Sequence, residues 1–169
     1  MHKTLLAGLA ALCLGATGAA AQVRNSGYDL PASLAVEAAI EALRSCEAAG
    51  YRVSVAVVDP SGEVKAAIKG DHSTVHTKDT SFRKAYTVVT LGPIFGFDTL
   101  SAFVERTKGN PAVPAFMSLP NVILLAGGVA VRAHGEIVAA IGVGGAPGGE
   151  KDEACAAAGL GKIADRLPR

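Results

Sequence analysis

The chain lacks tryptophan and is poor in other aromatic residues, with three tyrosines and five phenylalanines among its 169 residues. Proteins that bind single-stranded nucleic acid stack bases on aromatic side chains, so this composition suits that function poorly. The chain also lacks an excess of charge of either sign, since it has 16 basic and 15 acidic residues. Nucleic acid and anionic membrane surfaces both select for an excess of basic residues. We therefore expect neither as a partner.

Several motifs that identify catalysis are also missing. The sequence contains no GxSxG nucleophile elbow, no P-loop, no GxGxxG after a predicted strand and no histidine pair on a predicted helix. The motifs therefore identify no catalytic residues, and a binding function is favoured over an enzyme.

The N-terminus has the three parts of a secretory signal peptide. A short basic start, Met1–Lys3, is followed by the apolar run Thr4–Gly18 and by the small residues Ala19–Ala21. The run is too short for a membrane anchor and has no basic flank after it. We predict that residues 1–21 are removed, that the protein is periplasmic or secreted without a membrane anchor, that 22–30 are flexible, and that 31–169 form a single domain.

Only two cysteines remain after this predicted cleavage, Cys46 and Cys155. An exported protein meets an oxidising compartment, where an even count favours pairing. We predict a Cys46–Cys155 disulfide, which would close a loop of about 110 residues and stabilise the domain by roughly 4–5 kcal/mol. Two separate buried thiols are the alternative.

The predicted elements follow the order helix, two strands, helices, three strands, helix. Apolar residues recur at three- and four-residue steps between Pro31 and Gly50, as in a helix. Turn residues at 60–62 and at His134-Gly135 join strands as hairpins, which favours an antiparallel sheet over a doubly wound parallel one. The predicted fold is α/β (α+β). Its expected strands are 51–59, 63–69, 121–126, 128–133 and 136–143, and its later helices begin near 77, 99 and 149, the first of these ending near Leu91.

Glycine is concentrated where the last predicted strand meets the last predicted helix. Five glycines and a proline lie within Gly142–Gly149. Unpaired N–H groups at such a junction bind anions, so Gly144 and Gly145 are candidate ligand-binding residues. An ordinary connection that needs glycine to turn tightly is the alternative. Asp152 and Glu153 in the first helical turn would compete with an anion, which disfavours a phosphate more than a carboxylate.

A second group of candidate residues surrounds the start of the helix near 77. A neutral imidazole is a good iron or zinc ligand, and His76 is preferred over His72 because it adjoins the helix. Tyr86 is the other candidate metal ligand, and Arg83 and Lys84 are candidates for holding acidic groups of a ligand. The alternatives are a surface or capping histidine, core packing of the tyrosine, and a solvated helix face or internal ion pair for the two cations. We expect His134, in a hairpin turn, to meet only solvent.

Three blocks of sequence occur in a recognisable order: Val53–Asp59 with Ser61-Gly62; Arg83–Thr87; and Ala126–Val129 with Ala140–Gly145 and Lys151–Cys155. In these blocks, which span about Leu34–Leu160, the chain resembles the GlcG/HbpS family of haem-binding or haem-degrading-domain proteins, related to the C-terminal domain of some cobalamin adenosyltransferases. The resemblance implies a profilin-like three-layer α/β/α domain with a five-stranded antiparallel sheet. It also implies homo-oligomerisation and binding of haem or another tetrapyrrole.

Together these features suggest a secreted or periplasmic haem- or tetrapyrrole-binding protein. The ligand would lie between the His72–Tyr86 segment and the glycine-rich turn, with iron bound by His76 or Tyr86. Its propionates would meet Arg83, Lys84 or the turn amides. The alternatives are an enzyme or binding protein for a small organic acid, with His76 as acid or base, and an oligomeric accessory subunit without a small ligand.

Overall fold

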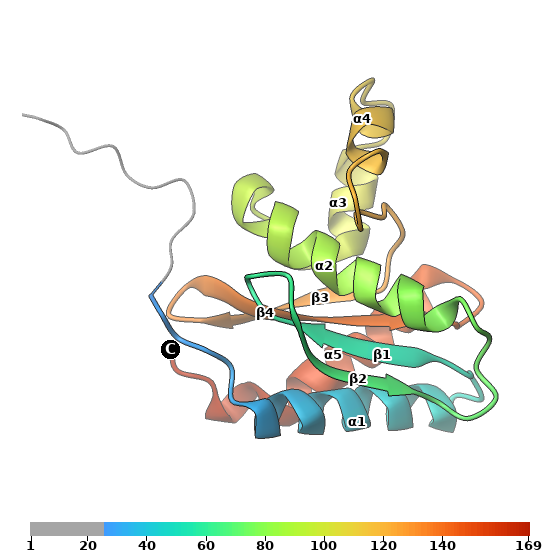
Figure 1. Ribbon diagram of the computed structural model, residues 1–169, viewed down its shortest axis with the longest axis vertical. Coiled ribbons are helices and arrows are strands. Elements are labelled where there is room, and N and C mark those ends of the chain that lie inside the picture. Colours follow the sequence, from blue (N-terminus) through green and yellow to red (C-terminus); the bar gives the residue numbers. More distant parts are fainter. Residues whose placement is uncertain (1–25) are drawn as a thin grey trace, which may run out of the picture.

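The computed structural model describes residues 26–169. An antiparallel sheet separates two helical layers, as predicted (Figure 1). Helices α1 (Ala32–Ala48) and α5 (Gly149–Ile163) cover one face of the sheet, and α2 (Thr77–Phe95) lies on the other. The predicted signal peptide, residues 1–21, lies outside the described residues. No helix within residues 26–169 is both long enough and apolar enough to span a membrane.

The sheet has four strands in the order β2-β1-β4-β3. The strands are β1 (Ser54–Val58), β2 (Val64–Lys69), β3 (Gly128–Ala133) and β4 (Glu136–Gly144). Two hairpins, β1–β2 and β3–β4, are joined by the pairing of β1 with β4 in the middle. Every residue of β1 is buried, which agrees with its valine-rich sequence, while β2 and β3 form the two edges.

The prediction of a fifth strand at 121–126 is wrong. This segment has no regular secondary structure and runs along α2. The Arg83 guanidinium donates a hydrogen bond to the Val122 carbonyl at 2.8 Å, and the Ile123 N–H donates one to the Thr87 hydroxyl at 2.9 Å. Side chains of α2 thus take the place of a neighbouring strand, which an apolar run in the sequence does not reveal.

Helix α2 continues past the expected end near Leu91. It includes Pro93 and ends at Phe95; the next residue, Gly96, caps it with a φ of 64°, the left-handed conformation that glycine adopts easily. The Gly96 N–H donates to the Gly92 carbonyl and closes the last turn. Helices α3 (Leu100–Arg106) and α4 (Val113–Met117) then project from the α2 side of the molecule (Figure 1), and η1 (Ala164–Arg166) follows α5.

The layer formed by α1 and α5 is closely packed because small residues line the contact between the two helices. A Cβ added to Gly159 would lie 2.5 Å from the Ala38 carbonyl oxygen. The predicted disulfide between Cys46 of α1 and Cys155 of α5 is present and crosslinks this layer. The opposite layer has a separate apolar core with aromatic contacts, including Phe97 stacked on Phe103 at 4.4 Å.

Candidate functional site

Lys84 of α2 and Asp152 of α5 form a buried ion pair at the glycine-rich turn. The Lys84 Nζ lies 2.7 Å from the Asp152 Oδ2, and the two side chains are only 2% and 3% exposed. Burial raises the pKa of Asp152, while the hydrogen bond and charge of Lys84 and the backbone N–H groups of Ala146 and Gly145 oppose that rise. Because α2 and α5 lie on opposite faces of the sheet, the pair fastens the two helical layers together.

The polar groups around this turn are largely satisfied within the chain. The Ala146 N–H donates to Asp152 Oδ1 at 2.9 Å. The neighbouring carboxylate of Glu153 accepts hydrogen bonds from the Gly127 N–H at 3.1 Å and the Ser101 N–H at 2.9 Å. Asp152 thus occupies a donor of the turn that an incoming anion would otherwise use, and Glu153 occupies two donors outside the turn.

The glycines of the turn also have a packing role. A Cβ at Gly144 would lie 2.4 Å from the Thr80 hydroxyl oxygen, and one at Gly145 would lie 2.5 Å from the Arg52 carbonyl oxygen. Gly145 has a φ of 134°, which side-chain-bearing residues rarely adopt. Close approach of a side chain at Gly144 and of the backbone at Gly145 therefore accounts for both glycines without a ligand.

The predicted ligand residues of α2 are spread along the helix. His76 is exposed just before α2, with its Nδ1 3.2 Å from the Thr74 hydroxyl. Arg83 is half-buried and bound to the Val122 carbonyl, and half-buried Tyr86 packs on Phe82 with ring centroids 5.6 Å apart. His76 and Tyr86 are ten residues apart, which corresponds to about 15 Å along a helix. One iron therefore meets one of them, not both.

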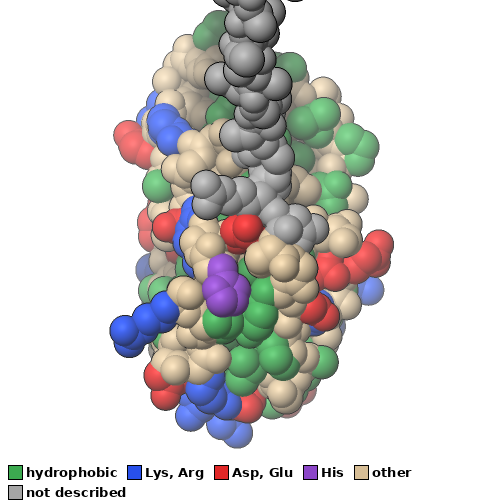
Figure 2. All heavy atoms as spheres, turned by 90° about the vertical axis from the view of Figure 1, so that its left-hand side faces the viewer, with side chains coloured by type: hydrophobic (Ala, Val, Ile, Leu, Met, Phe, Trp, Pro, Cys, Tyr) green, Lys and Arg blue, Asp and Glu red, His purple; other side chains and the backbone are tan. Residues whose placement is uncertain are grey.

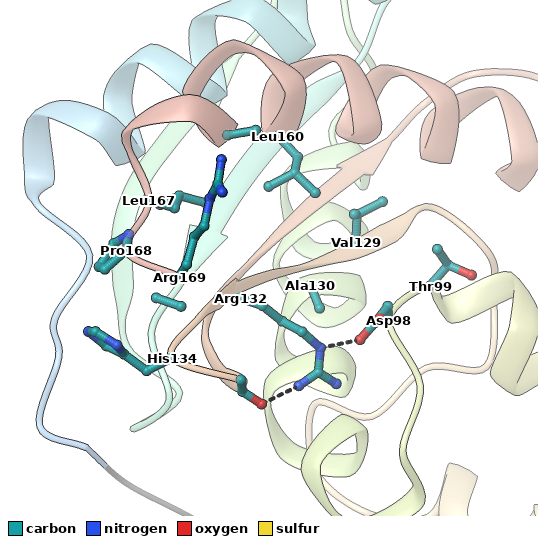
Figure 3. A pocket seen from close by; sticks show the side chains of 13 residues that line it. Asp98, Thr99, Val129, Ala130, Arg132, His134, Leu160, Leu167, Pro168 and Arg169 are labelled. Atoms are coloured by element: carbon teal, nitrogen blue, oxygen red, sulfur yellow. Dashed lines mark hydrogen bonds and ion pairs between the residues drawn. The ribbon is translucent and has the colours of Figure 1, made fainter.

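A cavity of about 530 Å³ lies elsewhere, along the edge strand β3. We call it the β3 groove. It is bounded by β3, by the C-terminal end of α5 with η1, and by the chain terminus (Figure 3). Its apolar walls include Val129, Ala130, Ala133, Leu160, Leu167 and Pro168. None of the predicted ligand residues lines this groove or either of two smaller cavities, of about 400 and 380 Å³, beside α3.

Five polar side chains border the β3 groove; Thr99 caps α3, and the other four fall into two pairs. Arg132 is engaged, because its Nε donates to Asp98 at 2.6 Å and its Nη1 donates to the Gly135 carbonyl at 3.0 Å (Figure 3). The side chains of His134 and Arg169, in contrast, have no hydrogen-bond or ion-pair partner among residues 26–169. The His134 ring makes an edge contact with the Tyr28 ring at 5.9 Å.

The position of His134 differs from the sequence expectation. The hairpin turn is present and His134 is exposed, with a φ of 52°, yet it borders the largest of the three cavities rather than open solvent alone. On the side of the molecule where the chain terminus and the β3–β4 turn lie, hydrophobic side chains gather beside a histidine (Figure 2). The groove combines residues near 98, 130 and 165, so no single sequence motif indicates it.

The described residues contain no cluster of three or more histidine, cysteine or acidic side chains that could hold a metal ion. His134 supplies the imidazole among the residues that line the β3 groove.

Comparisons with known proteins identify the family. Residues 30–161 match the family model described as haem degrading protein HbpS-like. A double mutant of Streptomyces reticuli HbpS has a crystal structure with a TM-score of 0.72 and 32% identity, covering 94% of this chain and 97% of that chain. No curated protein matches the sequence at a significant level.

Two more distant structures share the fold. Protein ORFY of Klebsiella pneumoniae has a TM-score of 0.71 at 19% identity, covering 84% of this chain and 97% of that chain. A PduOC–haem complex has a TM-score of 0.70 at 16% identity, covering 80% of this chain and 96% of that chain. The family model spans most of the described domain, and the agreement with HbpS extends over nearly the whole chain. This protein therefore belongs to the HbpS-like family.

Proposed function

We propose that this protein binds haem or a closely related tetrapyrrole. The observation that carries the proposal is its membership of the HbpS-like family, with 32% identity to HbpS over 94% of the chain. The fold is also that of PduOC, which was solved in complex with haem. If bound, haem would supply an iron centre, and the chain would supply the cavity, the cations for its propionates and a side-chain ligand for the iron.

The residues of this chain fit such a ligand in their chemistry. On the α2 side, His76 is the exposed imidazole, and Tyr86 is the other candidate iron ligand. Arg83 would contact a propionate by exchanging its hydrogen bond to the Val122 carbonyl. Lys84 is buried in its ion pair with Asp152, so its participation would require that pair to open, and Gly144 is buried as well.

The proposal includes export from the cytoplasm. It is supported by the order of basic, apolar and small residues in 1–21 and by the disulfide, since disulfides persist in oxidising compartments. Mass spectrometry of protein recovered from the periplasm or medium should give a chain that begins at Gln22 and lacks the two thiol hydrogens of Cys46 and Cys155. A chain that begins at Met1, or one with two free thiols, would contradict export.

Homo-oligomerisation is part of the same proposal. Apolar side chains are exposed at the end of α2 and in α4, where Phe95 contacts Phe116 at 5.6 Å between ring centroids and Ile94 and Met117 are 45% and 57% exposed. Exposed apolar clusters mark interaction sites. Light scattering should show an assembly larger than a monomer, and Phe95→Glu with Met117→Glu should shift it towards the monomer. A monomeric unmodified chain would overturn this part and the accessory-subunit alternative.

A small organic acid at the glycine-rich turn receives less support. Asp152 and Glu153 already accept hydrogen bonds from the amides of Ala146, Gly127 and Ser101. A second carboxylate would approach two existing ones, and like charges repel at short range.

The experiment that tests the main proposal is a titration of the mature protein with haemin. Binding should give a saturable shift of the Soret band, which His72→Ala, at an exposed histidine on a loop, should leave unchanged. Absence of a saturable shift in the unmodified protein would overturn the proposed function.

A further inference from the structure

We propose that the tetrapyrrole site is the β3 groove, with His134 as the axial iron ligand and Arg169 as the partner of a propionate. This inference rests on the proposed function and goes further, because it locates the ligand away from the α2 residues that the sequence singled out.

The size and walls of the β3 groove suit a large ligand with apolar faces. Its volume of about 530 Å³ lies within the range of roughly 300–1,000 Å³ that is usual for small-molecule sites. The walls come from three parts of the chain: Val129 on β3, Leu160 on α5, and Leu167 and Pro168 near the terminus (Figure 3). Leu160, Leu167 and Pro168 are partly exposed, so covering them with an apolar ligand would remove apolar surface from water, which is favourable.

The charges at the rim favour an acidic group on that ligand. Arg132 and Asp98 neutralise each other at 2.6 Å. Arg169 has no acidic partner among residues 26–169, so its guanidinium is the cation available to a carboxylate. A ligand with one apolar body and a carboxylate edge matches this arrangement.

His134 adds a metal-binding group to the same rim. Its ring has no hydrogen-bond partner among the described residues, and the left-handed backbone of the β3–β4 turn holds it at the end of the groove. A neutral imidazole is a common axial ligand of haem iron. An apolar body, carboxylates and an iron that accepts imidazole occur together in haem.

The alternative of an added peptide strand fits the groove less well. The outer edge of β3 is already engaged, because the Ala130 N–H donates to the Asp98 carbonyl at 2.7 Å and the His134 N–H donates to the Pro168 carbonyl at 3.4 Å. A peptide that extends a sheet needs such edge groups free.

The α2 side suits the tetrapyrrole less well than the β3 groove, because its cations already have partners. Lys84 is paired with Asp152 in the interior, and Arg83 holds the Val122 carbonyl. A ligand there would have to break these contacts, whereas the unpaired His134 and Arg169 lose no partner when they bind.

The test uses two probes, haemin and metal-free protoporphyrin, on the unmodified mature protein and on three variants. Arg169→Gln should weaken both probes about tenfold, because it removes the propionate partner. His134→Ala should abolish the iron-dependent Soret shift and weaken haemin binding at least tenfold, yet leave protoporphyrin binding, followed by fluorescence, nearly unchanged.

Ala164→Trp should weaken the binding of both probes. Ala164 lines the groove and is exposed, so a larger side chain there fills space without disturbing the core. His76→Ala and Arg83→Gln test the α2 side. The matched controls are His72→Ala and Arg44→Gln, at exposed residues that line none of the three cavities, and both should bind the two probes as the unmodified protein does.

The outcomes separate this inference from the proposed function. If the unmodified protein binds neither probe, the proposed function fails and this inference with it. If it binds haemin and the three groove variants bind equally well, only the groove assignment is overturned. Loss of the Soret shift in His76→Ala but not in His134→Ala would also overturn it, in favour of the α2 side. Normal binding by His134→Ala combined with weakened binding by Arg169→Gln would overturn the iron ligand and retain the groove.

Discussion

The polar side chains at the two ends of α5 differ in whether they have partners within the chain. At the N-terminal end, Asp152 is buried against Lys84 and accepts the Ala146 N–H. At the C-terminal end, the helix borders the β3 groove, where the side chains of His134 and Arg169 have no hydrogen-bond or ion-pair partner among the described residues. Burying a charge is tolerated when every polar group around it is satisfied, whereas an exposed charge without a partner beside an apolar cavity is available to a ligand. We therefore assign stability to the first end and binding to the second.

The largest expected effect on stability comes from the buried ion pair at the N-terminal end of α5. Lys84→Met leaves the Asp152 carboxylate buried without its counter-ion, and we expect a loss of about 3–5 kcal/mol in the free energy of unfolding. Urea unfolding at neutral pH measures it. The double variant Lys84→Met, Asp152→Leu should recover most of this loss, because both charges are then replaced by apolar groups. A loss below about 1 kcal/mol in the single variant would contradict the role given to the pair.

The pH dependence of this variant has a definite sign. Burial raises the pKa of Asp152 in the folded protein, and removing Lys84 removes an opposing influence. For an acid whose folded pKa exceeds its unfolded value, the stabilising contribution is complete below the unfolded pKa and is lost as the pH rises through the folded pKa. The deficit of Lys84→Met relative to the unmodified protein should therefore shrink as the pH falls, which urea unfolding at several acidic pH values can measure.

The disulfide in the middle of α5 is expected to have the next largest effect on stability. Replacing Cys46 and Cys155 together by alanine should lower the free energy of unfolding by about 2–5 kcal/mol, because the unfolded chain is no longer crosslinked. A thiol reductant should destabilise the unmodified protein and leave the double variant unaffected. Equal stability of the two proteins without reductant would show that the crosslink contributes little.

Two glycines of α5 near its C-terminal end provide a matched pair. A Cβ at Gly159 would lie 2.5 Å from the Ala38 carbonyl oxygen, so Gly159→Ala should destabilise by about 1–3 kcal/mol through overpacking. Gly161 has open space around that position, so Gly161→Ala should stabilise by about 0.5–1 kcal/mol through helix propensity. Thermal unfolding of both variants, side by side, measures the difference. Shifts of the same sign would contradict the close packing of α1 on α5.

The smallest effect concerns the exposed ion pair of Glu37 with Arg166, just after α5. The hydrogen bond from Arg166 lowers the pKa of Glu37. A lowered folded pKa gives a stabilising contribution that is present above the unfolded pKa and is lost as the pH falls through the folded pKa. Glu37→Gln should therefore lower the melting temperature slightly at neutral pH and low salt and hardly at all in acid. An equal decrease at both pH values would rule out the ion pair as its cause.

Local patterns in the sequence predicted much of the framework. The valine-rich run at β1, the His134-Gly135 turn and the helical spacing of α1 each depend on near neighbours, and all three appear in the structure. The pairing of Cys46 with Cys155 was predicted from their even number and the expected compartment. The segment 121–126 was misassigned because its hydrogen-bond partners, Arg83 and Thr87, lie on a helix far away in the sequence.

For the predicted site residues too, local sequence predicted the residue types, and distant residues decided their roles. Lys84 and Arg83 were recognised as cations next to a candidate histidine, with an internal ion pair as the alternative. Which role each plays depends on Asp152 and on the Val122 carbonyl, 68 and 39 positions away. The β3 groove was not predicted, because Asp98, Val129 and Arg169 carry no shared motif and meet only after folding.

The amino-acid sequence by itself determined the antiparallel α/β class, the two-hairpin order and the disulfide, because these depend on periodicity, turn residues and cysteine count. It indicated the family separately, through the resemblance of three ordered sequence blocks. Only the tertiary structure decided that the sheet has four strands, that Asp152 accepts the Ala146 N–H of the glycine-rich turn, and that an open groove follows β3. Those outcomes depend on which distant groups satisfy each other's hydrogen bonds and charges, and that is settled when the layers pack.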